Sequence, residues 1–330
     1  MPNFSGVWNL KEQIQALAAG RWTGIVISEL YAWGGNAYGQ LGDSTVISRS
    51  SPVQVGTLTN WSQAAVGLFH TAAVKTDGTL WTWGRNTEGQ IGDGTVIRRS
   101  SPVQIGALTN WYQIAAGTQH TASIKTDGTL WTWGWNNRGQ LGLNFSPGYR
   151  SSPVQVGALT DWAQVAGGDR HTAAIKTDGT LWTWGYNIMG QLGDSTIISR
   201  SSPVQVGALT TWAQVAAGGY HTAAIKTDGT LWTWGYNNMG QLGDNTLADR
   251  SSPVQIGALT NWSQPSAGAR HACSTKTDGT LWTWGRNSAG QLGDGTVVYR
   301  SSPVQVGALT TWSRVARGSQ GDHTVAISES

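Results

Sequence analysis

Six histidines fall at one position of a repeating pattern, and they are the residues of this sequence with the clearest potential for chemistry. They are His70, His120, His171, His221, His271 and His323. Imidazole is a common zinc ligand, but each ligand must come within about 2.0–2.1 Å of the ion. Histidines carried by separate units of a ring cannot converge so closely, so we predict no metal site. We interpret them as structural residues that tie one unit to the next by a hydrogen bond.

An acid and a base also recur, and their positions on one loop predict either an ion pair or a clamp on backbone carbonyls within that loop. The aspartates are Asp43, Asp93, Asp194, Asp244 and Asp294, and the arginines are Arg49, Arg99, Arg150, Arg200, Arg250 and Arg300. The third repeat departs from the pattern, because Leu143 replaces the aspartate and the loop is one residue longer. This loop adds the aromatic residues Phe145 and Tyr149, and we expect it to be exposed for contact with a partner.

Motifs for catalysis are missing from the sequence. It has no Gly-x-Ser-x-Gly elbow, no His-Glu-x-x-His pair and no Gly-x-x-x-x-Gly-Lys phosphate loop. The glutamates Glu12, Glu29, Glu88 and Glu329 lie at non-equivalent positions and form no acid–base pair. We therefore predict a non-enzymatic protein with no catalytic residues and no cofactor.

The composition is typical of turn-rich β-structure. Glycine accounts for 45 and tryptophan for 20 of the 330 residues, while charged residues make up 12%. The net charge is only +3 and the basic residues do not cluster, so we expect no nucleic-acid partner. No apolar run has the length of a membrane span, and no secretory signal is visible. The single cysteine, Cys273, excludes an internal disulfide framework.

One stretch organises the elements that position these residues. Lys75-Thr-Asp-Gly-Thr-Leu-Trp-Thr-Trp-Gly84 returns almost unchanged at Lys125, Lys176, Lys226 and Lys276. A period of about 50 residues indicates a propeller or a solenoid. Asp77-Gly78 predicts a hairpin with a two-residue type I′ turn, and Leu-Trp-Thr-Trp predicts a strand with two faces to bury.

Each repeat contains four candidate strands, which determine the number of blades. The first two strand types occur seven times and the last two occur six times. We therefore predict an all-β, seven-bladed β-propeller, with six blades plus an extra strand pair as the alternative. Residues 1–11 would form an N-terminal arm that closes the ring, and residues 12–330 a single propeller domain.

The repeat resembles that of the regulator of chromosome condensation family. The resemblance lies in Ala217-Gly218, His221-Thr222, Asp228-Gly229, Trp234-Gly235-Tyr236-Asn237 and Gly240-Gln241-Leu242-Gly243. It implies a seven-bladed propeller but no single function, because members include an exchange factor, a plant ultraviolet photoreceptor and bacterial inhibitors. The photoreceptor's Gly-Trp-Arg-His-Thr signature is absent, since this chain has Gly168-Asp-Arg-His-Thr172. No long insertion supplies the exchange factor's protruding wedge.

Three loop positions vary between otherwise near-identical repeats, and they gather aromatic, arginine and methionine residues. The candidate binding residues are Trp135, Tyr186, Met189, Tyr236, Met239, Phe145 and Tyr149. Residues 135, 186, 189, 236 and 239 belong to three successive repeats, so a propeller would place them on adjacent blades as one patch. This composition is typical of a recognition surface, although drift at exposed loop tips would also produce variation.

The N-terminal segment suggests a biological setting. Residues 6–22 are similar to a short segment of structural and tail-associated proteins of marine tailed phages. We therefore predict a virion protein that displays a loop face to a protein, a host-surface glycan or a neighbouring virion protein. A bacterial propeller, extracellular or cytoplasmic, that binds or inhibits a protein is one alternative, and a polysaccharide-acting enzyme is another. A homo-oligomer is compatible with either setting.

Overall fold

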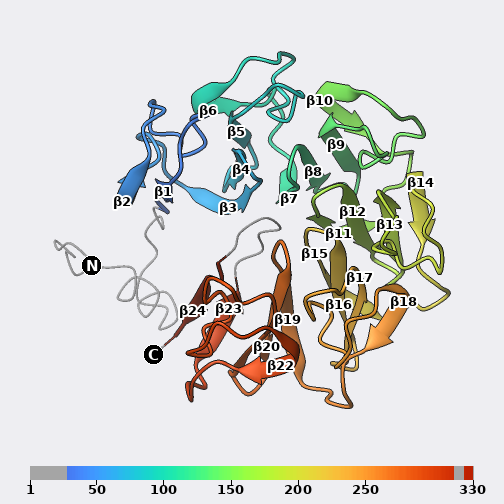
Figure 1. The fold of residues 1–330 in the computed structure, drawn as a ribbon. Coiled ribbons are helices and arrows are strands. Elements are labelled where there is room, and N and C mark those ends of the chain that lie inside the picture. Colours follow the sequence, from blue (N-terminus) through green and yellow to red (C-terminus); the bar gives the residue numbers. More distant parts are fainter. Residues whose placement is uncertain (1–27, 316–322, 330) are drawn as a thin grey trace, which may run out of the picture.

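The chain folds into a ring of small antiparallel sheets around a central axis (Figure 1). The computed structural model describes residues 28–315 and 323–329. Within these residues seven sheets follow one another, five with four strands and two, the first and the last, with two. This arrangement confirms the predicted all-β propeller and agrees with seven blades. The proposed arm, residues 1–11, lies outside the described residues, so its closing role stays a prediction.

The strands take the same order in every blade. The first sheet contains β1 (Tyr31–Gly34) and β2 (Arg49–Gln54). The innermost strands of the complete blades are β3 (Trp61–Val66), β7 (Trp111–Ala116), β11 (Trp162–Gly167), β15 (Trp212–Ala217) and β19 (Trp262–Ala267). The second strands are β4 (His70–Lys75), β8 (His120–Lys125), β12 (His171–Lys176), β16 (His221–Lys226) and β20 (His271–Lys276).

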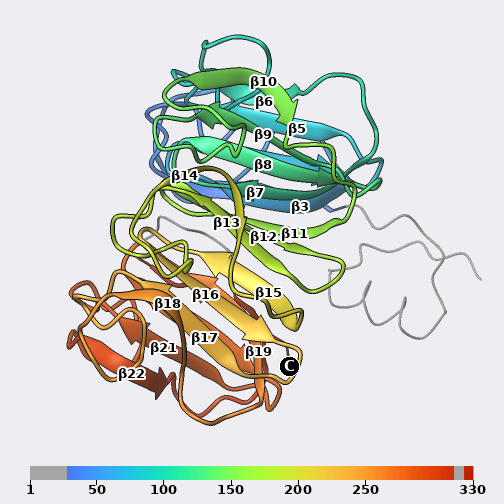
Figure 2. The ribbon, with the colours of Figure 1, turned by 90° about the vertical axis from the view of Figure 1, so that its right-hand side faces the viewer.

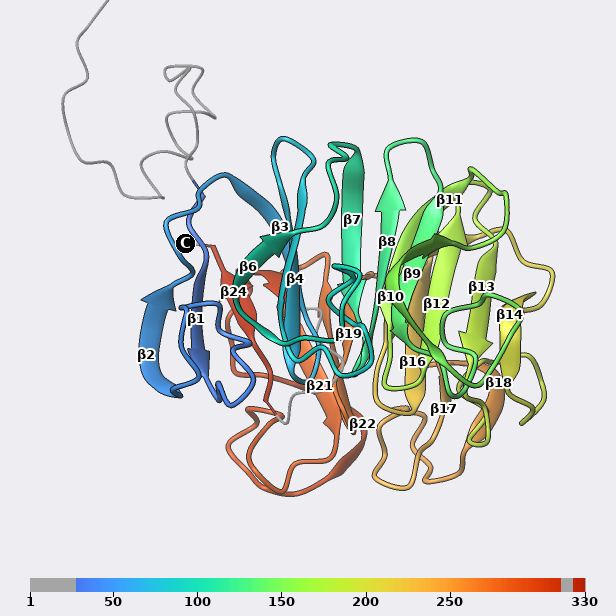
Figure 3. The same ribbon diagram turned by 90° about the horizontal axis from the view of Figure 1, so that it is seen from above.

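The third strands carry the Leu-Trp-Thr-Trp sequence, and the fourth lie at the rim (Figure 1). The third strands are β5 (Leu80–Gly84), β9 (Leu130–Trp135), β13 (Leu181–Gly185), β17 (Leu231–Gly235) and β21 (Leu281–Gly285). The fourth are β6 (Arg99–Gln104), β10 (Tyr149–Gln155), β14 (Arg200–Gln205), β18 (Arg250–Gln255) and β22 (Arg300–Gln305). The last sheet contains β23 (Trp312–Val315) and β24 (Ala326–Ser328). Figures 2 and 3 show the blades from the side, with loops at both faces of the ring.

The hydrophobic core lies between neighbouring blades. The second indole of each Leu-Trp-Thr-Trp strand is fully buried in the complete blades, as at Trp133 and Trp184. Trp133 contacts Trp111 of its own blade with ring centroids 6.1 Å apart, and its Nε1 donates to the carbonyl of Gln90 in the preceding repeat at 3.0 Å. Each sheet therefore buries both faces by packing against its neighbours, which a single sheet could not do.

The turn of the predicted hairpin is different from the expected one. Gly78 has a φ of +77°, but Asp77 is not in the left-handed region that a type I′ turn requires. The Gly78 amide donates to the carbonyl of Lys75 at 2.9 Å and the Lys75 amide to the carbonyl of Thr79 at 3.0 Å. This is a three-residue loop that ends in a left-handed glycine. Asp77 accounts for the difference, because its carboxylate accepts from the Thr79 amide and hydroxyl.

Four of the six histidines contact a threonine of the next blade. His70, His120 and His171 are fully buried, and each Nε2 lies 2.9–3.0 Å from a threonine hydroxyl of the next blade. His271 makes the same contact with Thr324 at 3.1 Å. His323 is exposed and follows the last complete blade, so its structural role stays a prediction.

A second set of links surrounds the central axis. The side-chain oxygen of Gln113 accepts from the Val165 amide at 2.7 Å, and that of Gln164 accepts from the Val215 amide at 2.9 Å. At the next interface Pro265 has no amide hydrogen, and the Gln214 side-chain amide donates to the Ser263 carbonyl instead. The same interface has Ala272 after His271, where threonine follows each of the other five histidines, and His221 Nε2 is buried with no hydrogen-bond partner among the described residues.

Candidate binding surface

A rigid hydrogen-bonded loop follows each Trp-Gly pair and fixes the variable residues beside it. In the fourth repeat Asn187 is fully buried, and its amide group donates to Asp194 at 3.0 Å and to two backbone carbonyls of the same loop. Asp194 in turn pairs with Arg200 at 2.9 Å. The predicted Asp–Arg ion pair is present in five repeats, at distances of 2.6–2.9 Å. The same hydrogen bonds and ion pair therefore hold the loop backbone in these five repeats.

Neighbouring loops bring several of the predicted residues into ring contact. Tyr220 lies between Tyr186 and Tyr236, with ring centroids 6.4 and 6.3 Å away. Both contacts are edge-to-face, which is a favourable geometry for aromatic pairs. The connection arises because His171 pairs with Gly185 and His221 with Gly235, so the residues before each histidine lie beside those after each Trp-Gly.

Arginines extend this cluster to the preceding blade. The Arg138 guanidinium lies 5.0 Å from the Tyr186 ring centroid, and that of Arg170 lies 5.2 Å from the Trp135 ring centroid. Such cation–π contacts hold both partners in place while leaving polar groups at the surface. We call this group the aromatic surface. It consists of Trp135, Arg138, Arg170, Tyr186, Tyr220 and Tyr236.

The electrostatics of the aromatic surface combine charge with partial burial. Arg170 and Asp169 approach to 3.5 Å, so the positive charge of Arg170 is partly compensated. Burial and the Asp169 carboxylate raise the pKa of Tyr220 above its usual value, so its hydroxyl stays protonated at neutral pH. All three tyrosine rings are half-buried, which leaves part of each ring available to a partner.

The predicted residues divide into three groups in the structure. Trp135, Tyr186 and Tyr236 belong to the aromatic surface, and Tyr149 pairs across the strands with Trp135. Phe145 instead stacks with the guanidinium of Arg150, and its ring centroid lies 4.1 Å from the Arg150 Cζ atom. Met189 and Met239 are half-buried, and their role stays a prediction.

Three members of the aromatic surface were not among the binding residues predicted from the sequence. Arg170 and Tyr220 occupy the variable pair before the histidine, and Arg138 follows Trp135 by three residues. The variation of these positions between repeats was the available signal. The sequence alone did not indicate that the two variable loops meet.

Other kinds of site find no support in the part of the chain that the structure describes. No group of three or more histidine, cysteine, aspartate or glutamate residues there could hold a metal ion. Desolvation lowers the pKa of the buried His70, His171 and His221 to about 3, so these imidazoles are neutral at pH 7. Residues 28–315 and 323–329 contain no helix that is long and apolar enough to cross a membrane.

Fold and surface together define a β-propeller with the features of a binding module. The RCC1-like domain matches residues 112–330, and the regulator of chromosome condensation (RCC1) repeat matches residues 28–74 and 77–124, with a second form of this repeat at 61–90. The chain therefore belongs to the RCC1-like domain family. The comparison with curated proteins gives no match.

Solved structures with the same fold include a human and a yeast protein. Human WBSCR16 is 23% identical, with a TM-score of 0.80 over 91% of this chain and 81% of that chain. Yeast RCC1 (Prp20), in its complex with Kap60, is 18% identical, with a TM-score of 0.67 over 92% of this chain and 90% of that chain. A further structure of Prp20p from Saccharomyces cerevisiae, described with its binding to Gsp1p and histones, is also 18% identical, with a TM-score of 0.66 over 92% of each chain. At these identities the likeness establishes the fold.

Proposed function

We propose that this chain is a non-enzymatic, protein-binding propeller whose partner contacts the aromatic surface. The observation that carries the proposal is the continuous cluster in which Tyr220 joins Tyr186 to Tyr236. Tyrosine, tryptophan and arginine are the residue types that dominate binding energy in protein interfaces. The fold family supports a protein-binding role, because the yeast protein of this fold is described as binding Kap60, Gsp1p and histones.

The rigidity of the loops favours the same function. Binding costs conformational entropy for every side chain that must be ordered, and this cost falls when the side chains are already held in place. The ring contacts of Tyr220 and the stack of Arg138 on Tyr186 hold these residues before a partner arrives. A partner would therefore meet a preformed patch with aromatic surfaces and arginine donors.

A photo-crosslinking experiment tests this placement. Benzoylphenylalanine at position 236 would lie in the aromatic surface. Position 112 is exposed and lies at the start of strand β7, whereas the loop before His120, residues 117–119, follows the other end of that strand. We expect a specific crosslinked protein from position 236 and none from position 112. Crosslinking to the same protein from both positions, or only from position 112, would place the partner on another face.

We further propose that the partner belongs to a tailed-phage particle or to the surface of its host. The similarity of residues 6–22 to phage structural proteins supports this setting, and these residues lie outside the described part of the chain. Mass spectrometry of purified particles should detect the chain in fixed ratio to tail or capsid proteins. Its absence from intact particles would contradict the virion setting while leaving protein binding untouched.

A further inference from the structure

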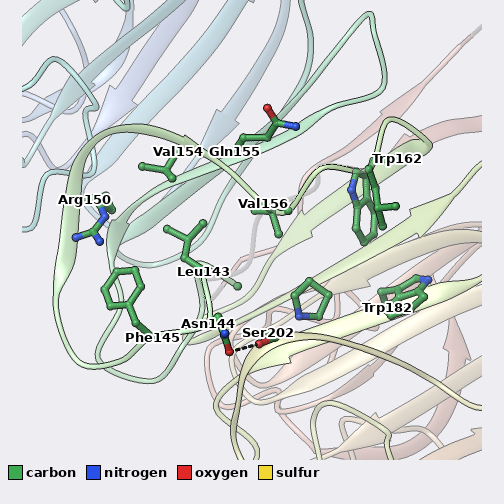
Figure 4. A pocket seen from close by; sticks show the side chains of 14 residues that line it. Leu143, Asn144, Phe145, Arg150, Val154, Gln155, Val156, Trp162, Trp182 and Ser202 are labelled. Atoms are coloured by element: carbon green, nitrogen blue, oxygen red, sulfur yellow. Dashed lines mark hydrogen bonds between the residues drawn. The ribbon is translucent and has the colours of Figure 1, made fainter.

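The loop of the third repeat forms one wall of a pocket that lies apart from the aromatic surface (Figure 4). The loop keeps the ordinary backbone path as far as Asn144, which has a φ of 62° and donates its amide to the Ser201 carbonyl. Ser195 in the next repeat has a φ of 64° and donates its amide to the Ser251 carbonyl in the same way. The loop of the third repeat then diverges at Phe145. The pocket has a volume of about 630 Å³, which is the size of a small-molecule site.

The replacement of aspartate by Leu143 gives the pocket its apolar floor. Leu143 packs against the core cluster between the two blades instead of pairing with an arginine. Val154, Trp182 and Pro203 add further apolar walls from both blades. Figure 4 shows Leu143 in the middle of the pocket, with Arg150 and Phe145 at one end and Trp182 at the other.

The same replacement leaves a positive charge at the edge of the pocket without a carboxylate. The arginines at the equivalent position pair with aspartates whose side chains are 3–6% exposed. Arg150 makes no ion pair with any described residue. Its Nη1 donates to the backbone carbonyl of Tyr149 at 3.2 Å, and its guanidinium stacks on Phe145. A stacked guanidinium retains free donors in the fork geometry that matches a carboxylate.

From these contacts we infer that the pocket binds a carboxylate attached to an apolar or aromatic group, with the carboxylate on Arg150 and the apolar part over Leu143 and Trp182. The ligand would supply the negative charge that aspartate supplies in the other repeats. A free organic acid and the C-terminal residue of a peptide share this chemistry. The inference is independent of the proposed protein partner, because no residue of the aromatic surface lines the pocket.

Ligand-observed NMR titration with 3-phenylpropionate, and with its uncharged amide, tests the inference on the full chain. We expect the acid to bind and the amide to bind at least about tenfold more weakly, because a charge-assisted hydrogen bond is lost. The peptide Gly-Ser-Gly-Phe, with a free or an amidated end, forms the second arm. Binding of the free acid alone would assign the site to small molecules, and binding of the free-ended peptide would assign it to chain ends.

Three variants locate the binding. Arg150→Gln should weaken binding of the acid at least about tenfold through loss of the charged partner. Leu143→Asp should weaken it similarly, because the new carboxylate would pair with Arg150 as Asp194 pairs with Arg200. Arg98→Gln is the matched control, because Arg98 is an exposed arginine on the preceding repeat's loop and should leave binding unchanged. Three results would overturn the inference. They are equal binding of an acid and its amide, no binding of 3-phenylpropionate or of the free-ended peptide, and unchanged binding of the acid by Arg150→Gln.

Discussion

The buried contacts between blades are nearly the same in each repeat, whereas the loops on one face of the ring differ between repeats. Between blades the histidine–threonine distances vary by only 0.2 Å, from 2.9 to 3.1 Å, across four interfaces. On the loop face the residues next to these histidines change from repeat to repeat, as at Phe69, Arg170 and Tyr220. The difference separates a scaffold, where substitutions should change stability, from a surface, where they should change binding.

Acid should have the largest effect on the scaffold. Burial lowers the folded-state pKa of His70, His171 and His221 to about 3 and that of His120 to about 4, from an ordinary 6.5. Below pH 6.5 the unfolded chain binds protons that the folded chain cannot, so stability is complete above that pH and falls as pH decreases toward 4. Each histidine should cost about 2 kcal/mol at pH 5. Urea denaturation at pH 7 and pH 5 measures the change, and equal stabilities would contradict the account.

Removal of one blade-to-blade link should have the next largest effect. His171→Ala should lower the free energy of unfolding by about 1–3 kcal/mol, because Thr222 loses its buried partner. His221→Ala is the matched control, because His221 is equally buried but its Nε2 has no hydrogen-bond partner in residues 28–315 and 323–329. Chemical denaturation should therefore give a smaller loss for His221→Ala. Equal losses would mean that the hydrogen bond contributes nothing beyond packing.

Restoration of the missing link should have a smaller effect. Ala272→Thr should raise the free energy of unfolding by about 1 kcal/mol, because the hydroxyl could reach His221 and the Gln241 carbonyl. Thr222 makes the equivalent bond to the Gln191 carbonyl at 2.9 Å. Ala223→Thr, at a buried position that faces no unpaired histidine, should instead destabilise through overpacking. A loss of stability in Ala272→Thr would count against the interface as described.

The sequence predicted the scaffold better than the surface, for physical reasons. The 50-residue period and alternating strands are local patterns, so the sheets and the loop ion pairs could be predicted from them. The predicted type of hairpin turn was wrong because the Asp77 side chain accepts hydrogen bonds from Thr79, which the Asp-Gly pair alone does not indicate. Tyr220 and Arg170 were not predicted as binding residues because their contacts depend on strand register. The substitution at Leu143 was visible, but its inward packing was not.

The affinity of the crosslinked partner for a loop-face variant tests the central claim most directly. Tyr186→Ala with Tyr236→Ala removes both neighbours of Tyr220, and these rings are half-buried at the surface. The account predicts a folded protein whose binding is weaker by about 2 kcal/mol or more, while Tyr112→Ala binds normally. Calorimetric titration with the partner measures both values. Unchanged affinity in a well-folded double variant would contradict the claim that this surface binds the partner.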